Sequence, residues 1–160
     1  MAMTKREFLN LSGITAVGLT FGCGKAADAK ASFPVTKSDA EWRRTLSPLS
    51  YKVLRQQYTE PAGTSPLDHE KRAGTFVCAG CGQKLYSSAT KFNSGTGWPS
   101  FYRPLAGAVA TSVDYKIGVA RTEVHCARCG GHLGHVFNDG PPPTGRRYCM
   151  NGAAMRFIAA

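Results

Sequence analysis

The sequence has no apolar run long enough to cross a membrane as a permanent helix. The best candidate, residues 11–22, is rich in small apolar residues but is shorter than the roughly 20 residues that a bilayer requires. The sequence also has no internal repeat and no low-complexity tract. At 160 residues it is long enough for one domain with a substantial core and too short for two. We therefore expect one globular domain.

Acidic residues are scarce. Ten Asp and Glu stand against twenty Lys and Arg, which gives a net charge of +10. This charge is compatible with a nucleic-acid partner, an anionic surface or simply a solvated exterior. The basic residues form no stripe, because they are spread along the chain from Lys52 to Arg156. Nucleic-acid-binding surfaces concentrate their basic residues, so we predict no nucleic-acid partner.

The N-terminal segment predicts export. Lys5 and Arg6 precede Phe8, Leu9 and the short apolar run, an arrangement that resembles a twin-arginine signal with lysine in place of the first arginine. We expect a protein of the periplasm or cell envelope.

Two kinds of processing are compatible with this segment. A-x-A patterns predict cleavage after Ala29 or Ala31, whereas Gly22 followed by Cys23 is typical of a lipoprotein site and would place a lipid anchor at Cys23. In either case we expect residues 1–31 to be the export signal and linker, and residues 32–160 to be the folded domain.

The remaining chain predicts a mainly β fold with two short N-terminal helices. Ser38 and Glu41 form a capping-box pattern that opens a helix through Leu46, and Pro48 opens a second helix. We expect the second helix to pack through Leu49, Val53, Leu54 and Tyr58. Short β-branched and aromatic runs then predict antiparallel strands at residues 75–77, 84–87, 101–102, 109–115, 117–124, 135–137, 147–150 and 154–158.

Two C-x-x-C pairs, Cys78 with Cys81 and Cys126 with Cys129, predict a four-cysteine zinc site that pins the β-sheets. The spacing lets one tight turn present two sulfurs to a tetrahedral ion, and the glycine after each pair lets the backbone curl around it. Disulfides or a redox C-x-x-C motif are the alternatives. The stretch between the pairs is longer than the roughly 15–20 residues of a zinc ribbon, so we expect one structural zinc in a larger β domain.

Cys149 is then the only uncommitted thiol of the folded domain. It lies beside Arg146 and Arg147, whose positive charge favours the reactive thiolate. Alternating strand geometry places Arg147 on the same face as Cys149. Cys149 is therefore a candidate nucleophile, and the alternative is a buried structural cysteine in a terminal strand.

Two further stretches suggest chemistry. Trp98 lies in a glycine- and proline-rich loop, and loops on a rigid scaffold often hold binding residues. His132 and His135 are three residues apart at the start of a strand. Since the four cysteines already supply a complete set of zinc ligands, general acid–base catalysis is the better functional interpretation of the histidines. The alternatives are a core tryptophan and two ordinary polar histidines.

Taken together, the motifs resemble those of the B-type peptide-methionine sulfoxide reductases from about Ser38 to Phe157. The shared motifs are the two C-x-x-C pairs, Ser94-Gly95-Thr96-Gly97-Trp98-Pro99-Ser100-Phe101, Arg121-Thr122-Glu123-Val124, His132-x-Gly134-His135-Val136-Phe137, Asp139-Gly140-Pro141 and Arg147-Tyr148-Cys149-x-Asn151. The resemblance implies reduction of methionine-R-sulfoxide, in proteins or free. Residues 32–160 would then be the catalytic domain of a thiol-dependent oxidoreductase that repairs proteins after oxidative stress.

The resemblance also implies roles for single residues. Cys149 thiolate attacks the sulfoxide sulfur while His135 foremost, or His132, protonates the departing oxygen, with Asn151 and a water in support. Trp98 and Phe137 bind the substrate, and Trp98 forms an apolar wall for the methyl group on sulfur. The product at Cys149 is a sulfenic acid.

One departure from many relatives concerns the reductant. Where they have a second, resolving cysteine, this chain has Thr96. We therefore expect an external thiol, either a thioredoxin-like protein or a small thiol, to reduce Cys149, and we expect the enzyme to be a monomer. The alternative function is a non-catalytic exported zinc β module that binds an anionic partner through its basic surface.

Overall fold

A computed structural model describes residues 32–160. The predicted export signal, including Lys5, Arg6 and Cys23, lies outside the described residues. Within residues 32–160, no helix is both long enough and apolar enough to traverse a bilayer.

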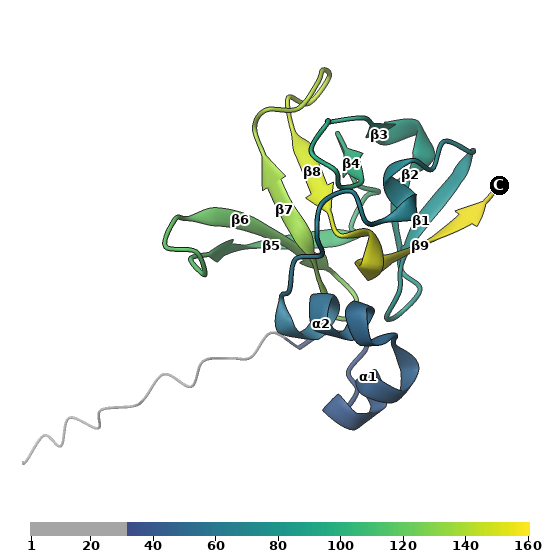
Figure 1. Cartoon of the computed structure of the whole chain (residues 1–160). Helices are drawn as coiled ribbons and strands as arrows, with labels where there is room; N and C mark the ends of the chain where they lie inside the picture. The colour runs from purple at the N-terminus through teal and green to yellow at the C-terminus, as the bar shows by residue number, and fades with distance from the viewer. Residues whose placement is uncertain (1–31) are drawn as a thin grey trace, which may run out of the picture. The chain divides into compact units, whose positions relative to one another are not determined.

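Two short helices precede the sheets, as predicted. Helix α1 (Asp39–Thr45) begins with the expected capping box between Ser38 and Glu41, and α2 (Pro48–Gln56) has Ser47 as its N-cap and Pro48 in its first turn. Figure 1 shows both helices at one end of the sheets.

The predicted packing face of the second helix is wrong in part. Val53 and Leu54 are buried, but Leu49 is 39% exposed and Tyr51 takes a place in the core. Tyr58 is 44% exposed and lies past the end of α2, because Gln57 adopts a left-handed conformation (φ 53°) that terminates the helix.

The β part forms two antiparallel sheets, which confirms the predicted fold class. A small sheet has the strand order β2-β1-β9, and a large sheet has the order β3-β4-β8-β7-β6-β5. The strands are β1 (Gly74–Cys78), β2 (Lys84–Ser87), β3 (Lys91–Phe92), β4 (Ser100–Phe101), β5 (Val109–Asp114), β6 (Arg121–Cys126), β7 (His132–Phe137), β8 (Arg147–Met150) and β9 (Met155–Ala159). Three short 3-10 helices connect them: η1 (Pro66–Asp68), η2 (Ser88–Thr90) and η3 (Gly152–Ala154).

An aromatic core is shared by residues of the two sheets. Tyr86 of the small sheet stacks on Phe101 of the large sheet at 4.3 Å between ring centroids, and Phe76 meets Phe101 edge-on at 4.9 Å. The Tyr86 hydroxyl donates to the sulfur of Met150 at 3.1 Å. These four side chains are fully buried, and each contributes about 1.5–3 kcal/mol of transfer free energy. Met150 lies directly after Cys149, so the core fixes the position of β8.

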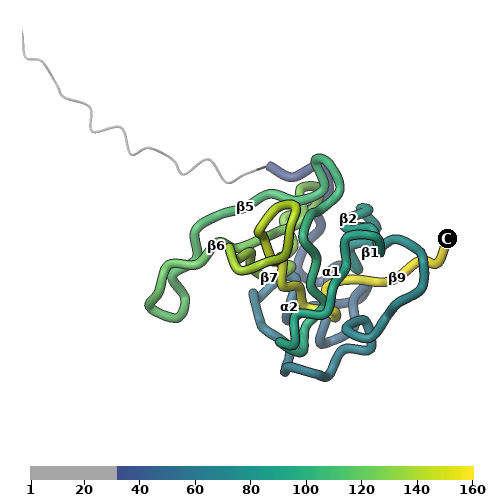
Figure 2. Tube along the Cα trace, turned by 90° about the horizontal axis from the view of Figure 1, so that it is seen from above, coloured from purple at the N-terminus to yellow at the C-terminus, as the bar shows by residue number. Residues whose placement is uncertain are grey.

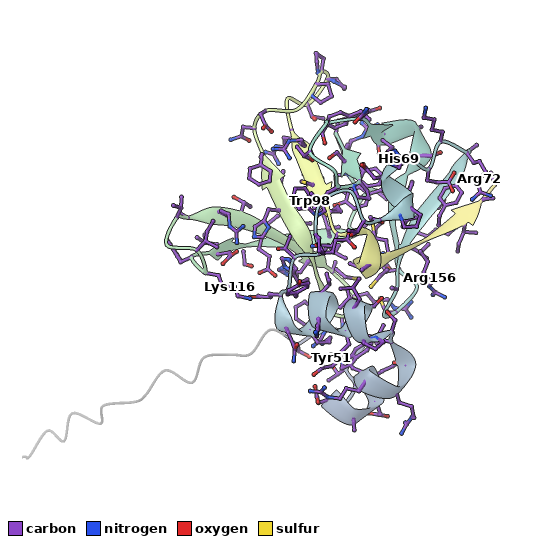
Figure 3. The ribbon with its side chains drawn as sticks, viewed as in Figure 1. Tyr51, His69, Arg72, Trp98, Lys116 and Arg156 are labelled. Carbon is purple, nitrogen blue, oxygen red and sulfur yellow. The ribbon has the colours of Figure 1, made fainter. Side chains whose placement is uncertain are left out.

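The large sheet has a central part and a projecting end. Strands β8 and β7 are central in the strand order, whereas β5 and β6 extend away from the rest as a hairpin (Figures 1 and 2). Lys116, at the turn of this hairpin (Figure 3), donates to the main-chain oxygens of Gln56, the last residue of α2, and of Gln57, its C-cap. The hairpin is thereby tied to the end of α2, and Asp114 of its last pair, which faces Arg121, contacts His135 of the central strand β7.

Candidate active site

The site is built on the two central strands of the large sheet. Cys149 on β8 is paired in register with His135 on β7, so the two side chains lie on one face of the sheet. A cavity of about 130 Å³ opens beside this pair. Its lining residues are Thr59, Trp98, Arg121, Gly134, His135, Phe137, Cys149 and Asn151. Five of the residues singled out from the sequence thus meet at one cavity.

His135 is held by an acidic partner from the β5–β6 hairpin. Its Nε2 lies 2.7 Å from Oδ2 of Asp114, and the same oxygen accepts from Arg121 at 2.6 Å. The backbone N–H of Lys116 and the hydrogen bond with His135 keep the pKa of Asp114 well below its usual range. Because Asp114 is therefore ionised, Nε2 of His135 is the donor to it. Burial lowers the pKa of His135, and the hydrogen bond to Asp114 opposes this effect.

His132 is held in a similar way by Glu123 but does not line the cavity. Its Nδ1 lies 2.7 Å from Oε1 of Glu123, while its buried Nε2 has no hydrogen-bond partner in the protein. Residues three apart in a regular strand point to opposite faces. A register shift in the β6–β7 pairing changes this, and the rings of His132 and His135 lie edge-on at 5.3 Å between centroids.

Trp98 and Asn151 are both tied to the main chain of Glu60. The Trp98 indole N–H donates to the carbonyl of Glu60 at 3.0 Å, and Oδ1 of Asn151 accepts from its backbone N–H at 2.9 Å. The Asn151 side chain also donates to the carbonyl of Leu133 at 3.0 Å. Figure 3 shows Trp98 near the centre of the molecule.

Arg147 lies next to the cavity lining and not within it. Its guanidinium binds both carboxylate oxygens of Asp139, at 2.9 and 2.8 Å, and packs over the ring of Phe137 at 4.5 Å. The hydrogen bonds with Asp139 raise the pKa of Arg147, and the negative charge of a Cys149 thiolate raises it further. Arg147 is therefore electrostatically coupled to Cys149, and its guanidinium also packs on the ring of Phe137.

The loop before Trp98 approaches the thiol. The hydroxyl of Thr96 lies 3.8 Å from Sγ of Cys149 and 2.8 Å from the hydroxyl of Ser94, which in turn lies 2.7 Å from that of Ser100. The hydroxyl of Thr96 is thus in contact with the sulfur of the candidate nucleophile.

Several residues of the site received no role from the sequence. They are Thr59, Arg121 and Gly134 in the lining, and Glu60, Asp114 and Glu123 behind it. The sequence offered one signal for Gly134, namely its position between the two histidines. The structure explains why glycine is needed there, because a Cβ at this position would meet the carbonyl oxygen of Cys149 at 2.1 Å. Arg121 and Glu123 lie in one of the motifs shared with the family, but that motif suggested no role for them. Asp114 and Glu60 had no local signal, since strand pairing brings Asp114 to His135 and η3 brings two N–H donors to Glu60.

The two C-x-x-C pairs come together as predicted. All four sulfurs lie within 4.8 Å of one another, with Cys78 to Cys129 at 3.8 Å and Cys81 to Cys126 at 3.6 Å. A tetrahedral ion with bonds of about 2.3 Å requires sulfurs about 3.8 Å apart, so the cluster fits a metal ion. The cysteines Cys78 and Cys126 end β1 and β6, and therefore join the small sheet to the large one.

The turns around this cluster explain its geometry. Gly82 and Gly130, which follow the two pairs, adopt φ of +74° and +66° and donate their N–H groups to the carbonyls of Cys78 and Cys126. Arg55 of α2 donates to the carbonyl of Cys129 at 3.0 Å, so the second helix is fastened to the turn of the second C-x-x-C pair.

Comparison with known proteins first defines the class. Residues 46–159 match the SelR domain, which is most of the described chain. The chain is also 53% identical to "Peptide methionine sulfoxide reductase MsrB" of Leptospira interrogans over 127 residues, covering 79% of this chain and 97% of that protein. Proteins with the same name from Bradyrhizobium diazoefficiens and Thiobacillus denitrificans are each 54% identical, over 76% of this chain and 88% and 92% of theirs. The chain belongs to the family of B-type peptide methionine sulfoxide reductases.

Proposed function

We propose that this enzyme reduces methionine-R-sulfoxide, in proteins or free, to methionine, with Cys149 as the nucleophile. One observation supports this most directly: Cys149 and His135 form a cross-strand pair at a cavity whose other lining residues include Trp98 and Phe137. The cavity of about 130 Å³ suits a small side-chain group, and the named relatives act on methionine sulfoxide. A non-catalytic zinc module would not need this arrangement and is not favoured.

The proposed reaction begins with the Cys149 thiolate. Its sulfur attacks the sulfoxide sulfur and forms a sulfur–sulfur bond, while protonated His135 gives its proton to the sulfoxide oxygen. The protonated oxygen then passes to the Cys149 sulfur as the sulfur–sulfur bond breaks. Methionine leaves reduced by two electrons, and Cys149 remains as a sulfenic acid, oxidised by two electrons.

The surrounding residues prepare these steps. Asp114 orients His135 and favours its protonated form, whereas burial of the ring opposes protonation. Arg147 places a positive charge close to Cys149, and His132, whose buried Nε2 has no partner in the protein, can hold a water beside His135. Trp98 and Phe137 provide apolar surface for the methyl group on sulfur.

We further propose that the metal is a single structural zinc ion. Four thiolates in a closed tetrahedral set are the usual ligands of such an ion. Zinc held by Cys78, Cys81, Cys126 and Cys129 would stabilise the junction of the two sheets and would leave no ligand position for substrate.

The reductant and the cellular location are also proposals. An external thiol, from a thioredoxin-like protein or a small molecule, returns Cys149 to its reduced form. The enzyme acts as an exported monomer of the periplasm or cell envelope, and replacing Lys5 and Arg6 by alanine should retain it inside the cell. Fractionation of cells that express the two forms tests this location.

The test of the function is reduction of the separated R and S sulfoxides of N-acetylmethionine with dithiothreitol. We expect turnover of the R epimer and a far lower rate with the S epimer. Turnover of neither epimer, with Cys149 reacting as slowly with a thiol reagent as an ordinary thiol, would contradict the proposal.

A further inference from the structure

Glu60 is a buried carboxylate outside the cavity lining. It lies in the loop after α2 and is 2% exposed. Burial raises the pKa of Glu60, and the backbone N–H groups of Ala153 and Gly152 oppose this effect. A carboxylate is costly to bury unless its oxygens accept hydrogen bonds, so the contacts of this side chain indicate what it holds in place.

The side chain of Glu60 fixes the turn that follows the catalytic strand. Its Oε1 accepts from the N–H of Gly152, and its Oε2 accepts from the N–H of Ala153 at 2.9 Å. Both donors belong to η3, only three and four residues after Cys149. The packing there is tight, because a Cβ on Gly152 would meet the hydroxyl of Ser65 at 1.8 Å. The carboxylate therefore sets the position of residue 60 relative to the end of β8.

The main chain of the same residue holds two cavity-lining side chains. Its carbonyl accepts a hydrogen bond from the Trp98 indole N–H, and its own N–H donates to Oδ1 of Asn151. Thr59, the preceding residue, lines the cavity itself. A movement of residue 60 would therefore move Trp98 and Asn151 together with respect to Cys149.

We propose that Glu60 is a positioning residue that sets the distance between Trp98 and the Cys149 thiol, and so adjusts the cavity to a methyl group on sulfur. This inference rests on the proposed function, because the methyl sulfoxide is the substrate that it concerns. Glu60 does not touch the reacting atoms; it acts through Trp98 and Asn151.

The test is the ratio of kcat/KM for a methyl sulfoxide to kcat/KM for the matching ethyl sulfoxide, with the R epimers of N-acetylmethionine and N-acetylethionine sulfoxide. The ratio does not depend on the fraction of active enzyme, so a loss of stability alone does not change it. In the zinc-loaded enzyme, Glu60→Ala should lower the ratio by about threefold or more, since displaced binding groups lose discrimination. Glu60→Gln keeps one acceptor oxygen and should lower it less.

The matched control is Glu70→Gln, which changes an acid bound to Arg72 and away from the cavity lining. It should leave the ratio unchanged. Trp98→Phe removes the indole N–H, and adding Glu60→Ala to it should then produce little further loss. An unchanged ratio in a folded Glu60→Ala enzyme, or fully additive losses in the double variant, would overturn the proposal. If Glu60→Ala does not fold, Glu60→Gln is judged by the same two criteria.

A second measurement separates this inference from the proposed function. The chain has two tryptophans, so Trp42→Phe leaves Trp98 as the only indole emitter. In that background Glu60→Ala should shift the emission maximum of Trp98, and an unchanged maximum would count against positioning. An enzyme that turned over no sulfoxide but showed the shift would contradict the function and leave the positioning role standing.

Discussion

Cys149 lies directly opposite His135 across the β7–β8 pairing, at the cavity that Trp98 and Asn151 also line. In such a pair the Cβ atoms are about 4.5–5.5 Å apart, so the two side chains reach the same cavity. Both strands are central in the large sheet, so the pair is held by hydrogen bonds on either side. The arrangement gives the proposed nucleophile and the proposed proton donor a fixed separation.

Replacing the nucleophile should abolish turnover and leave the fold intact. In Cys149→Ser a hydroxyl, which is far less nucleophilic than a thiolate at neutral pH, takes the place of the thiol. We expect no measurable reduction of the R sulfoxide, with zinc content and circular dichroism as in the wild type. Retained turnover in this variant would show that another group attacks the sulfoxide.

Removing the acid behind His135 should change the pH dependence. The pKa of His135 is lowered by burial, and Asp114 acts in the opposite direction, so Asp114→Asn should lower this pKa further. The protonated imidazole then disappears at a lower pH. We expect the alkaline limb of the pH profile of kcat/KM to move to lower pH by on the order of one unit.

The control for this profile is Asp39→Asn, which removes an acid of α1 that is bound to Arg43 of the same helix and to Tyr51 of α2, and should leave the limb in place. An alkaline limb that stays fixed in Asp114→Asn, or that moves to higher pH, would rule out protonated His135 as the donor.

The features that the sequence predicted well have local causes. Most strand positions follow from alternating side chains, although β3 was not predicted, residues 117–120 form no strand and β7 begins three residues earlier than predicted, at His132. The cysteine cluster follows from two tight turns that end in Gly82 and Gly130. The helix starts follow from Ser38 and Pro48. Each signal lies within a few residues of the feature that it predicts.

The features that were missed depend on contacts between distant residues. Asp114 is an ordinary strand acid in sequence and Glu123 is known only as part of a shared motif without a role, and the pairing of β5, β6 and β7 brings both to the histidines. The register shift in β6–β7 likewise has no local signal. Glu60 is a single acid in a loop, and its burial depends on η3 some 90 residues later. The left-handed conformation of Gln57 ends α2 before Tyr58, which we expected on the packing face of this helix, and Tyr58 is exposed as a result.

Breaking the metal cluster should destabilise the whole domain. Cys126→Ser removes one of four ligands at the junction of the two sheets, so bound zinc should be lost and the free energy of unfolding should fall by several kcal/mol. Metal analysis and urea denaturation measure the two effects. A variant with unaltered stability and unaltered metal content would contradict the four-cysteine zinc site.

The last prediction concerns how Cys149 is reduced after turnover. The hydroxyl of Thr96 contacts the sulfur at 3.8 Å, whereas the other four cysteines of the described residues form the four-cysteine cluster that fits a metal ion. Threonine cannot form a disulfide, so the sulfenic acid should persist until an external thiol arrives. Mass spectrometry after one turnover without reductant, in the presence of dimedone, should therefore find an adduct at Cys149. Thr96→Cys should instead yield a disulfide between the introduced cysteine and Cys149, while the exposed Thr64→Cys, as a control, should retain the adduct. A disulfide from Cys149 to Cys23 or to a metal-binding cysteine in the wild type would show that the chain has its own resolving thiol.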